Sequence, residues 1–223
     1  MPLSFTPIKI LLGAEHLEGD LLAPPGARGL VLFAHGSGSD RRSIRNRYVA
    51  SRLAHRRLAT LVFNLLTAEE TAVDERTQEH RFNVRLLAER VAAVIDWAEW
   101  MFPDLPVGLF GSSTGAAAAL VAAAARPMRV GAIVSRGGRP DLAGDALHSV
   151  VAPTLALVGS EDPVVLELNR DSLARLAGHW RVRVIPGAGH LFEEPGTLEE
   201  VARLAADWFV HYLSLGQPAP LHP

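Results

Sequence analysis

The chain contains no cysteine and almost no lysine. The absence of cysteine excludes disulfide bonds, thiolate metal sites and a cysteine nucleophile. Lys9 is the only lysine, and it falls in a segment that we expect to be an N-terminal strand. Schiff-base or pyridoxal chemistry needs a lysine positioned at the reacting centre, so the sequence argues against both.

The chain also lacks a strong charge of either sign and a long hydrophobic run. Its net charge is −2, so no general attraction to nucleic acid or to an anionic membrane surface is expected. The first residues, MPLSFTPIKI, have no basic stretch followed by an apolar one, as a secretion signal would. The alanine-rich run 116–125 is too short to cross a bilayer. We therefore expect a soluble protein of the cytoplasm, without nucleic-acid or membrane partners.

What the sequence does contain is an alternation of strand-like and helix-like segments. At 223 residues, 48% of them hydrophobic, the chain fits one α/β domain over residues 1–223. Alternation of this kind predicts a mostly parallel, doubly wound sheet. The expected strands cover residues 5–12, 16–23, 30–34, 58–65, 107–110, 130–135, 154–159 and 182–185, and the expected helices cover 41–57, 79–101, the alanine-rich segment, 164–177 and 197–213.

The segments between these elements are short. Residues 66–78 are polar and acidic, and we expect a loop or small flap there. A short helix or loop is expected at 140–149, which leaves no room for a large lid domain, and residues 217–223 are expected to fray.

The most informative segment is PVGLFGSSTGAAAALVAAAAR, residues 106–126. A short apolar run leads into Gly111-Ser112-Ser113-Thr114-Gly115, and an alanine-rich helix follows. A G-x-S-x-G pentapeptide between a strand and a helix is typical of a nucleophile elbow, in which a serine sits on a sharp, strained turn. Ser113 is therefore the candidate nucleophile.

Three other predicted strands also end in chemically useful residues. The sequence HGSGS, residues 35–39, follows the strand at 30–34; Asp162 follows 154–159, and His190 follows 182–185. Ligands of parallel sheets bind beyond the carboxyl ends of the strands, so we expect these residues to converge. The chain order nucleophile, acid, histidine is the order found in α/β-hydrolases.

These motifs, VGLFGSSTGA, ALVGSEDPVV and VIPGAGHLFEEP, resemble those of the α/β-hydrolase superfamily, and more narrowly its dienelactone-hydrolase-like group. The resemblance implies a cofactor-independent enzyme in which Ser113 attacks a carbonyl, His190 carries the proton and Asp162 orients the histidine. It also implies an oxyanion hole built from backbone N–H groups of Thr114 and of Gly36 or Ser37. Dienelactone hydrolases proper use a cysteine nucleophile, so a serine here places the enol-lactone substrate in question.

Several residues have competing interpretations. Glu161 and Asp141 are alternatives to Asp162 as the partner of His190, and Asp162 is also expected to cap the helix that starts at Pro163. We expect His35 to brace the turn formed by HGSGS, residues 35–39, which we call the oxyanion turn. No histidine or carboxylate spacing suggests a metal ion, and no cofactor is expected.

Arginines cluster near the expected site. Arg45 follows the oxyanion turn, and Arg136 follows the strand at 130–135. A solvated helix face would explain such arginines; alternatively, Arg45 or Arg136 binds a carboxylate or phosphate of the substrate, since guanidinium forks suit these groups.

The sequence thus predicts a serine hydrolase of small carboxylic esters or lactones. Thioester or peptide cleavage on the same residues is an alternative, because a fold does not fix a substrate. A non-catalytic hydrolase-like scaffold is a third possibility. Phosphate binding by HGSGS is not expected, because the turn lacks the lysine and spacing of a phosphate-binding loop.

Overall fold

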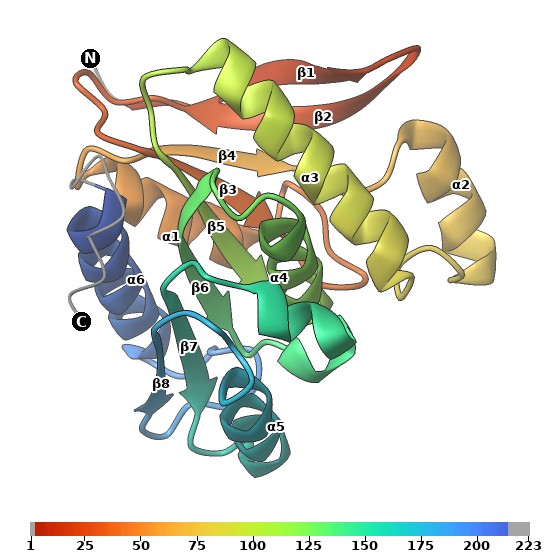
Figure 1. Cartoon of the computed structure of the whole chain (residues 1–223). Coiled ribbons are helices and arrows are strands. Elements are labelled where there is room, and N and C mark those ends of the chain that lie inside the picture. Colours follow the sequence, from red (N-terminus) through yellow and green to blue (C-terminus); the bar gives the residue numbers. More distant parts are fainter. Residues whose placement is uncertain (1–2, 214–223) are drawn as a thin grey trace.

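An eight-stranded sheet forms the centre of the molecule in the computed structural model, which describes residues 3–213 (Figure 1). The strand order is β1-β2-β4-β3-β5-β6-β7-β8. The strands from β3 to β8 run parallel, whereas β1 and β2 form an antiparallel hairpin and β2 pairs antiparallel with β4. The strands are β1 (Thr6–Leu12), β2 (Glu15–Leu22), β3 (Leu30–Ala34), β4 (Ala59–Phe63), β5 (Val107–Ser112), β6 (Val130–Arg136), β7 (Thr154–Gly159) and β8 (Trp180–Ile185).

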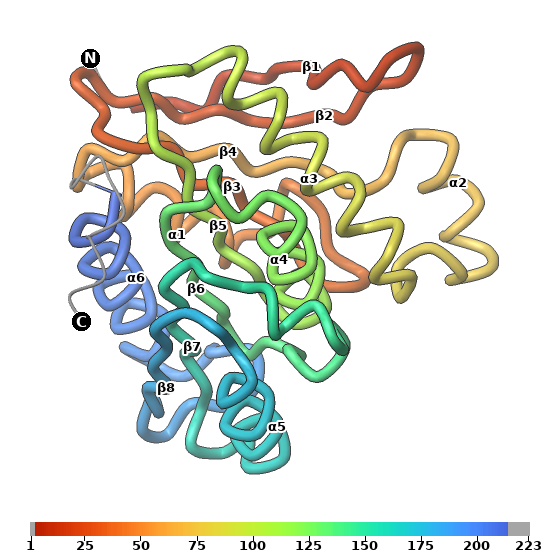
Figure 2. Tube along the Cα trace, viewed as in Figure 1, coloured from red at the N-terminus to blue at the C-terminus, as the bar shows by residue number. Residues whose placement is uncertain are grey.

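Helices cover both faces of this sheet, as the trace in Figure 2 shows. On one face lie α1 (Ile44–Ala54) and α6 (Thr197–Leu213), which pack with Val31, Phe110 and Val134 in one apolar core. On the other face lie α3 (Val84–Met101), α4 (Thr114–Ala125), α5 (Pro163–Leu173) and the 3-10 segment η1 (Pro140–Ser149). The predicted doubly wound α/β architecture is therefore confirmed.

The central strands are buried on both faces, which explains their continuous apolar sequences. Every residue of β3, β4, β5 and β7 is buried. A parallel strand covered by helices on both sides has no polar face, so it shows no alternation of polar and apolar residues. Because β3, β5, β6 and β7 pair in parallel as neighbours, their carboxyl ends lie together at one edge of the sheet.

The expectation for residues 66–78 was wrong, because most of this segment is a helix, α2 (Ala68–Thr77). Thr67 and Glu70 form a capping box, in which each side chain accepts a hydrogen bond from the other residue's backbone N–H. Such a box satisfies two N–H groups that the helix start leaves without acceptors. The helix has only one buried residue, Asp74, so no apolar stripe revealed it in the sequence.

Side-chain caps also explain why two other helices begin later than predicted. Ser43 accepts a hydrogen bond from the Asn46 N–H and starts α1 at residue 44 instead of 41. Asn83 accepts one from the Leu86 N–H and starts α3 at residue 84 instead of 79. Both are typical helix N-caps.

No large lid interrupts the domain, as expected, because only residues 137–153 separate β6 from β7 and most of them form η1. Within residues 3–213, no helix has the length and apolar character needed to cross a membrane. The expected frayed tail, 217–223, lies outside the described residues.

Candidate active site

Ser113 lies on a strained turn between β5 and α4. Its φ and ψ are 50° and −123°, a region that residues with a side chain rarely adopt. Strain of this kind is found at functional sites and costs about 1–3 kcal/mol per residue. The hydroxyl-bearing residue is thus held at the carboxyl edge of the sheet, with the first turn of α4 directly behind it.

The two glycines of the pentapeptide permit this turn because α4 approaches the sheet closely. A Cβ at Gly111 would clash with the Ala116 backbone, and one at Gly115 would clash with the carbonyl oxygens of Ala34 and His35. The alanines of α4 serve the same close packing, since most of the helix is buried. The sequence G-x-S-x-G here is therefore a steric requirement of the strand–turn–helix geometry.

His190 and Asp162 meet at the same edge. The His190 Nδ1 lies 2.6 Å from the Asp162 Oδ2, and the Asp162 side chain is largely buried. Asp162 does occupy the N-cap position of α5, but its carboxylate makes no capping hydrogen bond. The expected capping role of its side chain was therefore wrong, because the carboxylate faces His190 instead.

The two alternative acids are engaged elsewhere. Asp141 accepts both hydrogen bonds of a bidentate pair with Arg139, at 2.8 and 2.7 Å. Glu161 accepts a hydrogen bond from the Ser160 hydroxyl. Of the three carboxylates considered, the structure brings only Asp162 to the imidazole.

Ser113 and His190 both lie close to the segment Arg136–Gly137. The Ser113 N–H donates to the Arg136 carbonyl at 3.3 Å, and a Cβ on the next residue, Gly137, would lie 3.5 Å from the His190 Nδ1. Within residues 3–213, no hydrogen bond joins the Ser113 hydroxyl to His190. Hydrogen bonds of catalytic groups are often long in ligand-free enzymes and shorten when substrate binds.

The oxyanion turn lies against Ser113. A Cβ at Gly36 would stand 3.1 Å from the Ser113 Cβ. Thr114 is the first residue of α4, so its N–H has no acceptor within the helix. The Ser37 N–H, by contrast, donates to the Thr114 Oγ1 at 2.9 Å, so an incoming oxyanion would compete with that hydroxyl for the Ser37 amide.

His35 braces this turn, as expected from the sequence. Its Nε2 accepts a hydrogen bond from the Leu65 N–H at 3.1 Å, and its Nδ1 lies 2.9 Å from the Gly36 carbonyl oxygen. These two contacts define a neutral ring with the proton on Nδ1. Burial lowers the pKa of His35, and this effect outweighs the opposing influence of the Gly36 carbonyl and of Asp40. The ring therefore stays neutral and links the end of β3 to the segment after β4.

The two candidate arginines come from different elements, Arg45 from the first turn of α1 and Arg136 from the end of β6. Arg136 is the last residue of β6 and is only 8% exposed. Burial, with a further contribution from the charge of Arg45, lowers the pKa of Arg136 to about 10. Arg45 donates through Nη1 to Glu193 at 2.8 Å, three residues beyond His190 in the chain.

A cavity of about 580 Å³ adjoins the oxyanion turn. Its walls are residues 35–40, the segment after β4, and α2 with Arg81 beyond it; Ser113 and His190 do not line it. A volume of this size lies within the usual range of small-molecule sites. The cavity extends from the oxyanion turn toward α2.

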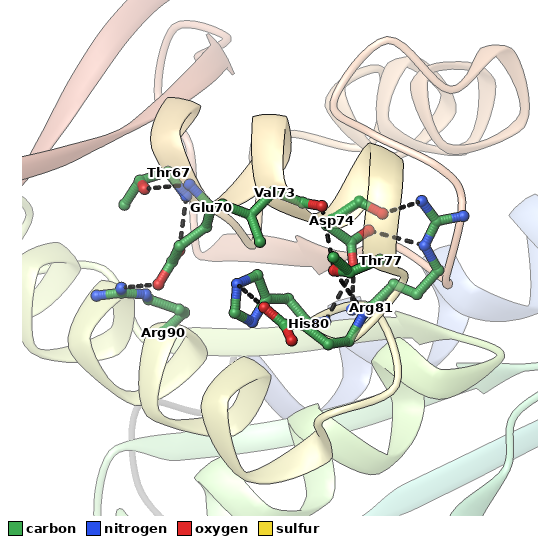
Figure 3. A network of polar contacts seen from close by, with 9 residues as sticks. Thr67, Glu70, Val73, Asp74, Thr77, His80, Arg81 and Arg90 are labelled. Carbon is green, nitrogen blue, oxygen red and sulfur yellow. Dashed lines mark hydrogen bonds and ion pairs between the residues drawn. The ribbon is translucent and has the colours of Figure 1, made fainter.

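The wall formed by α2 is fixed by a polar network that the sequence analysis missed (Figure 3). Asp74 accepts hydrogen bonds from the backbone N–H groups of His80 and Arg81 and from the Arg81 Nε. Burial alone would raise the pKa of Asp74, but these hydrogen bonds and the Arg81 charge together lower it. The sequence signal available was the capping box Thr67–Glu70, which marks the start of a helix.

Within residues 3–213, no three histidine or carboxylate side chains come close enough together to hold a metal ion. The candidate site therefore consists of a hydroxyl, an imidazole, a carboxylate and backbone N–H groups. This set can perform nucleophilic attack, proton transfer and stabilisation of an oxyanion.

Comparison with curated proteins gives close relatives of about twice this length. Two proteins of Mycobacterium tuberculosis, from strains CDC 1551 and H37Rv, carry a provisional name as phosphoribosyl transferases and are each 55% identical over 215 residues. The match covers 95% of this chain but 47% of each relative, so the chain spans about half the length of these proteins.

Comparison with solved structures and with family models identifies the fold family. A crystal structure titled dienelactone hydrolase, from Anabaena variabilis, is 52% identical, has a TM-score of 0.92 and covers 94% of this chain and 98% of its own. Est1E from Butyrivibrio proteoclasticus shares the fold at 15% identity, with a TM-score of 0.75 and coverage of 93% and 99%. The model of the alpha/beta hydrolase domain matches residues 27–203. The chain therefore belongs to the α/β-hydrolase family.

Proposed function

We propose that this chain is a serine hydrolase that cleaves small carboxylic esters or lactones through an acyl-enzyme on Ser113. The observation that carries the proposal is the strained elbow at Ser113, with His190 paired to Asp162 at the same edge of the sheet. A strained, partly exposed serine at the same sheet edge as an oriented imidazole is the arrangement that nucleophilic acyl transfer requires.

In this mechanism His190 takes the proton of the Ser113 hydroxyl as the oxygen attacks the ester carbonyl. Asp162 accepts the Nδ1–H of the ring, which leaves Nε2 free to receive that proton. The carbonyl oxygen becomes an oxyanion that the N–H groups of Thr114 and of Gly36 or Ser37 stabilise. His190 then protonates the leaving alcohol, and a water molecule repeats the sequence to release the acid. No cofactor takes part in any of these steps.

Small substrates are favoured by the cavity beside the oxyanion turn and by the absence of a lid domain between β6 and β7. Thioesters undergo the same steps, because a thiolate leaves from the same tetrahedral intermediate; relative rates on acetyl esters, thioesters and lactones distinguish these substrates.

Phosphoribosyl transfer, the activity in the provisional name of the M. tuberculosis relatives, is not what we propose for this chain. The relatives extend well beyond the matched region, and the matched region carries the hydrolase domain.

A fluorophosphonate probe tests the proposal. The wild-type protein should be labelled at Ser113 and should hydrolyse p-nitrophenyl acetate, and Ser113→Ala should abolish both. Ser112→Ala is the matched control, because Ser112 is the adjacent residue in β5, and it should keep both activities. A folded wild-type protein that is never labelled would favour the non-catalytic scaffold.

A further inference from the structure

The Arg136 guanidinium is buried, and residues 3–213 supply no counter-ion to it. Only 8% of the residue is exposed, and its Nη1 is fully buried without a hydrogen-bond partner. Within residues 3–213, no carboxylate lies within ion-pair distance of this side chain, and no hydrogen bond to it is formed. An unpaired buried charge is strongly unfavourable, and proteins normally pair such groups.

A second guanidinium, that of Arg45, adds its charge to the surroundings of Arg136 and contributes to the lowering of its pKa. In the described part of the chain, the Arg45 Nε is also buried without a hydrogen-bond partner, and its Nη1 is paired with Glu193. Arg45 lies in the first turn of α1, which contains no acidic residue. Arg45 thus adds a like charge and the positive end of a helix dipole, and among the described residues its one ion-pair partner is the exposed carboxylate of Glu193. Each of these features favours an anion.

Arg136 is also placed next to the candidate nucleophile. The order β4-β3-β5-β6 puts Ser113, at the end of β5, between the cavity beside β3 and β4 and Arg136 at the end of β6. The Arg136 carbonyl accepts the Ser113 N–H, and the side chain extends on the α1 face, where Ala132 and Val134 of the same strand also point. A molecule bound at Ser113 thus has the cavity in the direction of β3 and β4 and Arg136 at the end of the neighbouring strand β6.

We propose that Arg136 and Arg45 bind an anionic group of the substrate, a carboxylate or a phosphate, so that the preferred esters are anions. Guanidinium forks bind both groups through paired hydrogen bonds. The identification of the bound anion as a substrate rests on the proposed hydrolase function, but anion binding itself can be measured without turnover.

Binding is tested in the Ser113→Ala protein with succinate and with inorganic phosphate, by thermal shift and calorimetry. At least one anion should raise the melting temperature, and the stronger of the two identifies the preferred group. Adding Arg136→Met should abolish the effect. Arg52 is an exposed arginine of α1, the helix that holds Arg45, and Arg52→Gln should leave the rise in melting temperature unchanged.

Arg136→Met should also be at least as thermostable as its parent without anions, because it replaces an unpaired buried charge with an apolar chain. A structural role for Arg136 predicts the opposite, a large loss of stability. Arg45→Gln and Arg136→Lys are tested beside it, so that anion binding is also measured in variants that change less of the buried structure. Both variants should weaken anion binding: Arg45→Gln removes one guanidinium, and Arg136→Lys replaces the paired N–H donors of a guanidinium with a single ammonium group.

Selectivity is tested with p-nitrophenyl glutarate, an anion, against the neutral p-nitrophenyl pentanoate of similar length. The ratio of their kcat/KM values should fall at least tenfold in Arg136→Met, equivalent to about 1.4 kcal/mol. An unchanged ratio, or anion binding that persists in the variant, would overturn this proposal while leaving the hydrolase function intact. Anion binding without hydrolysis of any ester would instead refute the hydrolase function and leave the anion site standing.

Discussion

Replacing Ser113 by glycine and by alanine separates the strain of the elbow from the chemistry of its hydroxyl. The turn holds this residue at φ 50° and ψ −123°, which costs about 1–3 kcal/mol for a residue with a Cβ. Alanine keeps the Cβ and therefore the strain, whereas glycine removes it. Glycine also makes the unfolded chain more flexible, which offsets about 0.5–1 kcal/mol of the gain.

The net expectation is that Ser113→Gly is more stable than Ser113→Ala by about 1 kcal/mol, which raises the melting temperature by about 2–4 °C in a domain of this size. Both variants should be inactive. Calorimetry on the two proteins under identical conditions measures the difference. If the glycine variant is no more stable than the alanine variant, the elbow stores no strain, and the argument that this turn was built to expose a nucleophile fails.

Three further predictions concern the surroundings of the site. Thr114→Val should lower stability in urea unfolding by about 1–3 kcal/mol, because the Ser37 N–H loses its acceptor; Thr114→Ser should keep it, and equal losses in both would contradict the role of the hydroxyl. The lowered pKa of His35 means that the unfolded chain binds a proton more readily, so stability falls as the pH drops below about 6.5. His35→Gln should flatten the dependence of the unfolding free energy on pH between 7 and 5, and an unchanged slope would refute the assignment. Asp74→Asn should destabilise the protein by about 1–3 kcal/mol at neutral pH, because the hydrogen bonds from Arg81 are weakened. The lowered pKa of Asp74 gives stability that is present at neutral pH and lost as the pH falls through the folded value, so the two proteins should converge in acid.

The fold was predictable wherever burial determined the sequence. The apolar runs at 30–34 and 154–159 coincide with β3 and β7, because a strand covered on both faces has little choice of residue. The pentapeptide 111–115 was equally informative, since its glycines are required by the close approach of α4. Helix α2 was missed because Asp74 is its one buried residue, so its sequence carries no apolar stripe, and the helix is stabilised by its caps and by Asp74.

The site was less predictable because side chains choose among partners in three dimensions. Asp162 fits a helix cap as well as it fits a partner of His190, and only the structure shows which group its carboxylate meets. The engagement of the Ser37 N–H with the Thr114 hydroxyl joins residues 77 positions apart. The burial of Arg136 with no counter-ion among the described residues depends on which face of β6 it occupies and on what packs there, which its sequence neighbours do not encode.

Trapping the covalent intermediate is the most direct test of the account. Wild-type protein mixed rapidly with p-nitrophenyl acetate, quenched in acid and digested should yield one acetylated peptide, with the acetyl group on Ser113. An acetyl group found only on another residue, or ester turnover that persists in Ser113→Ala, would contradict it.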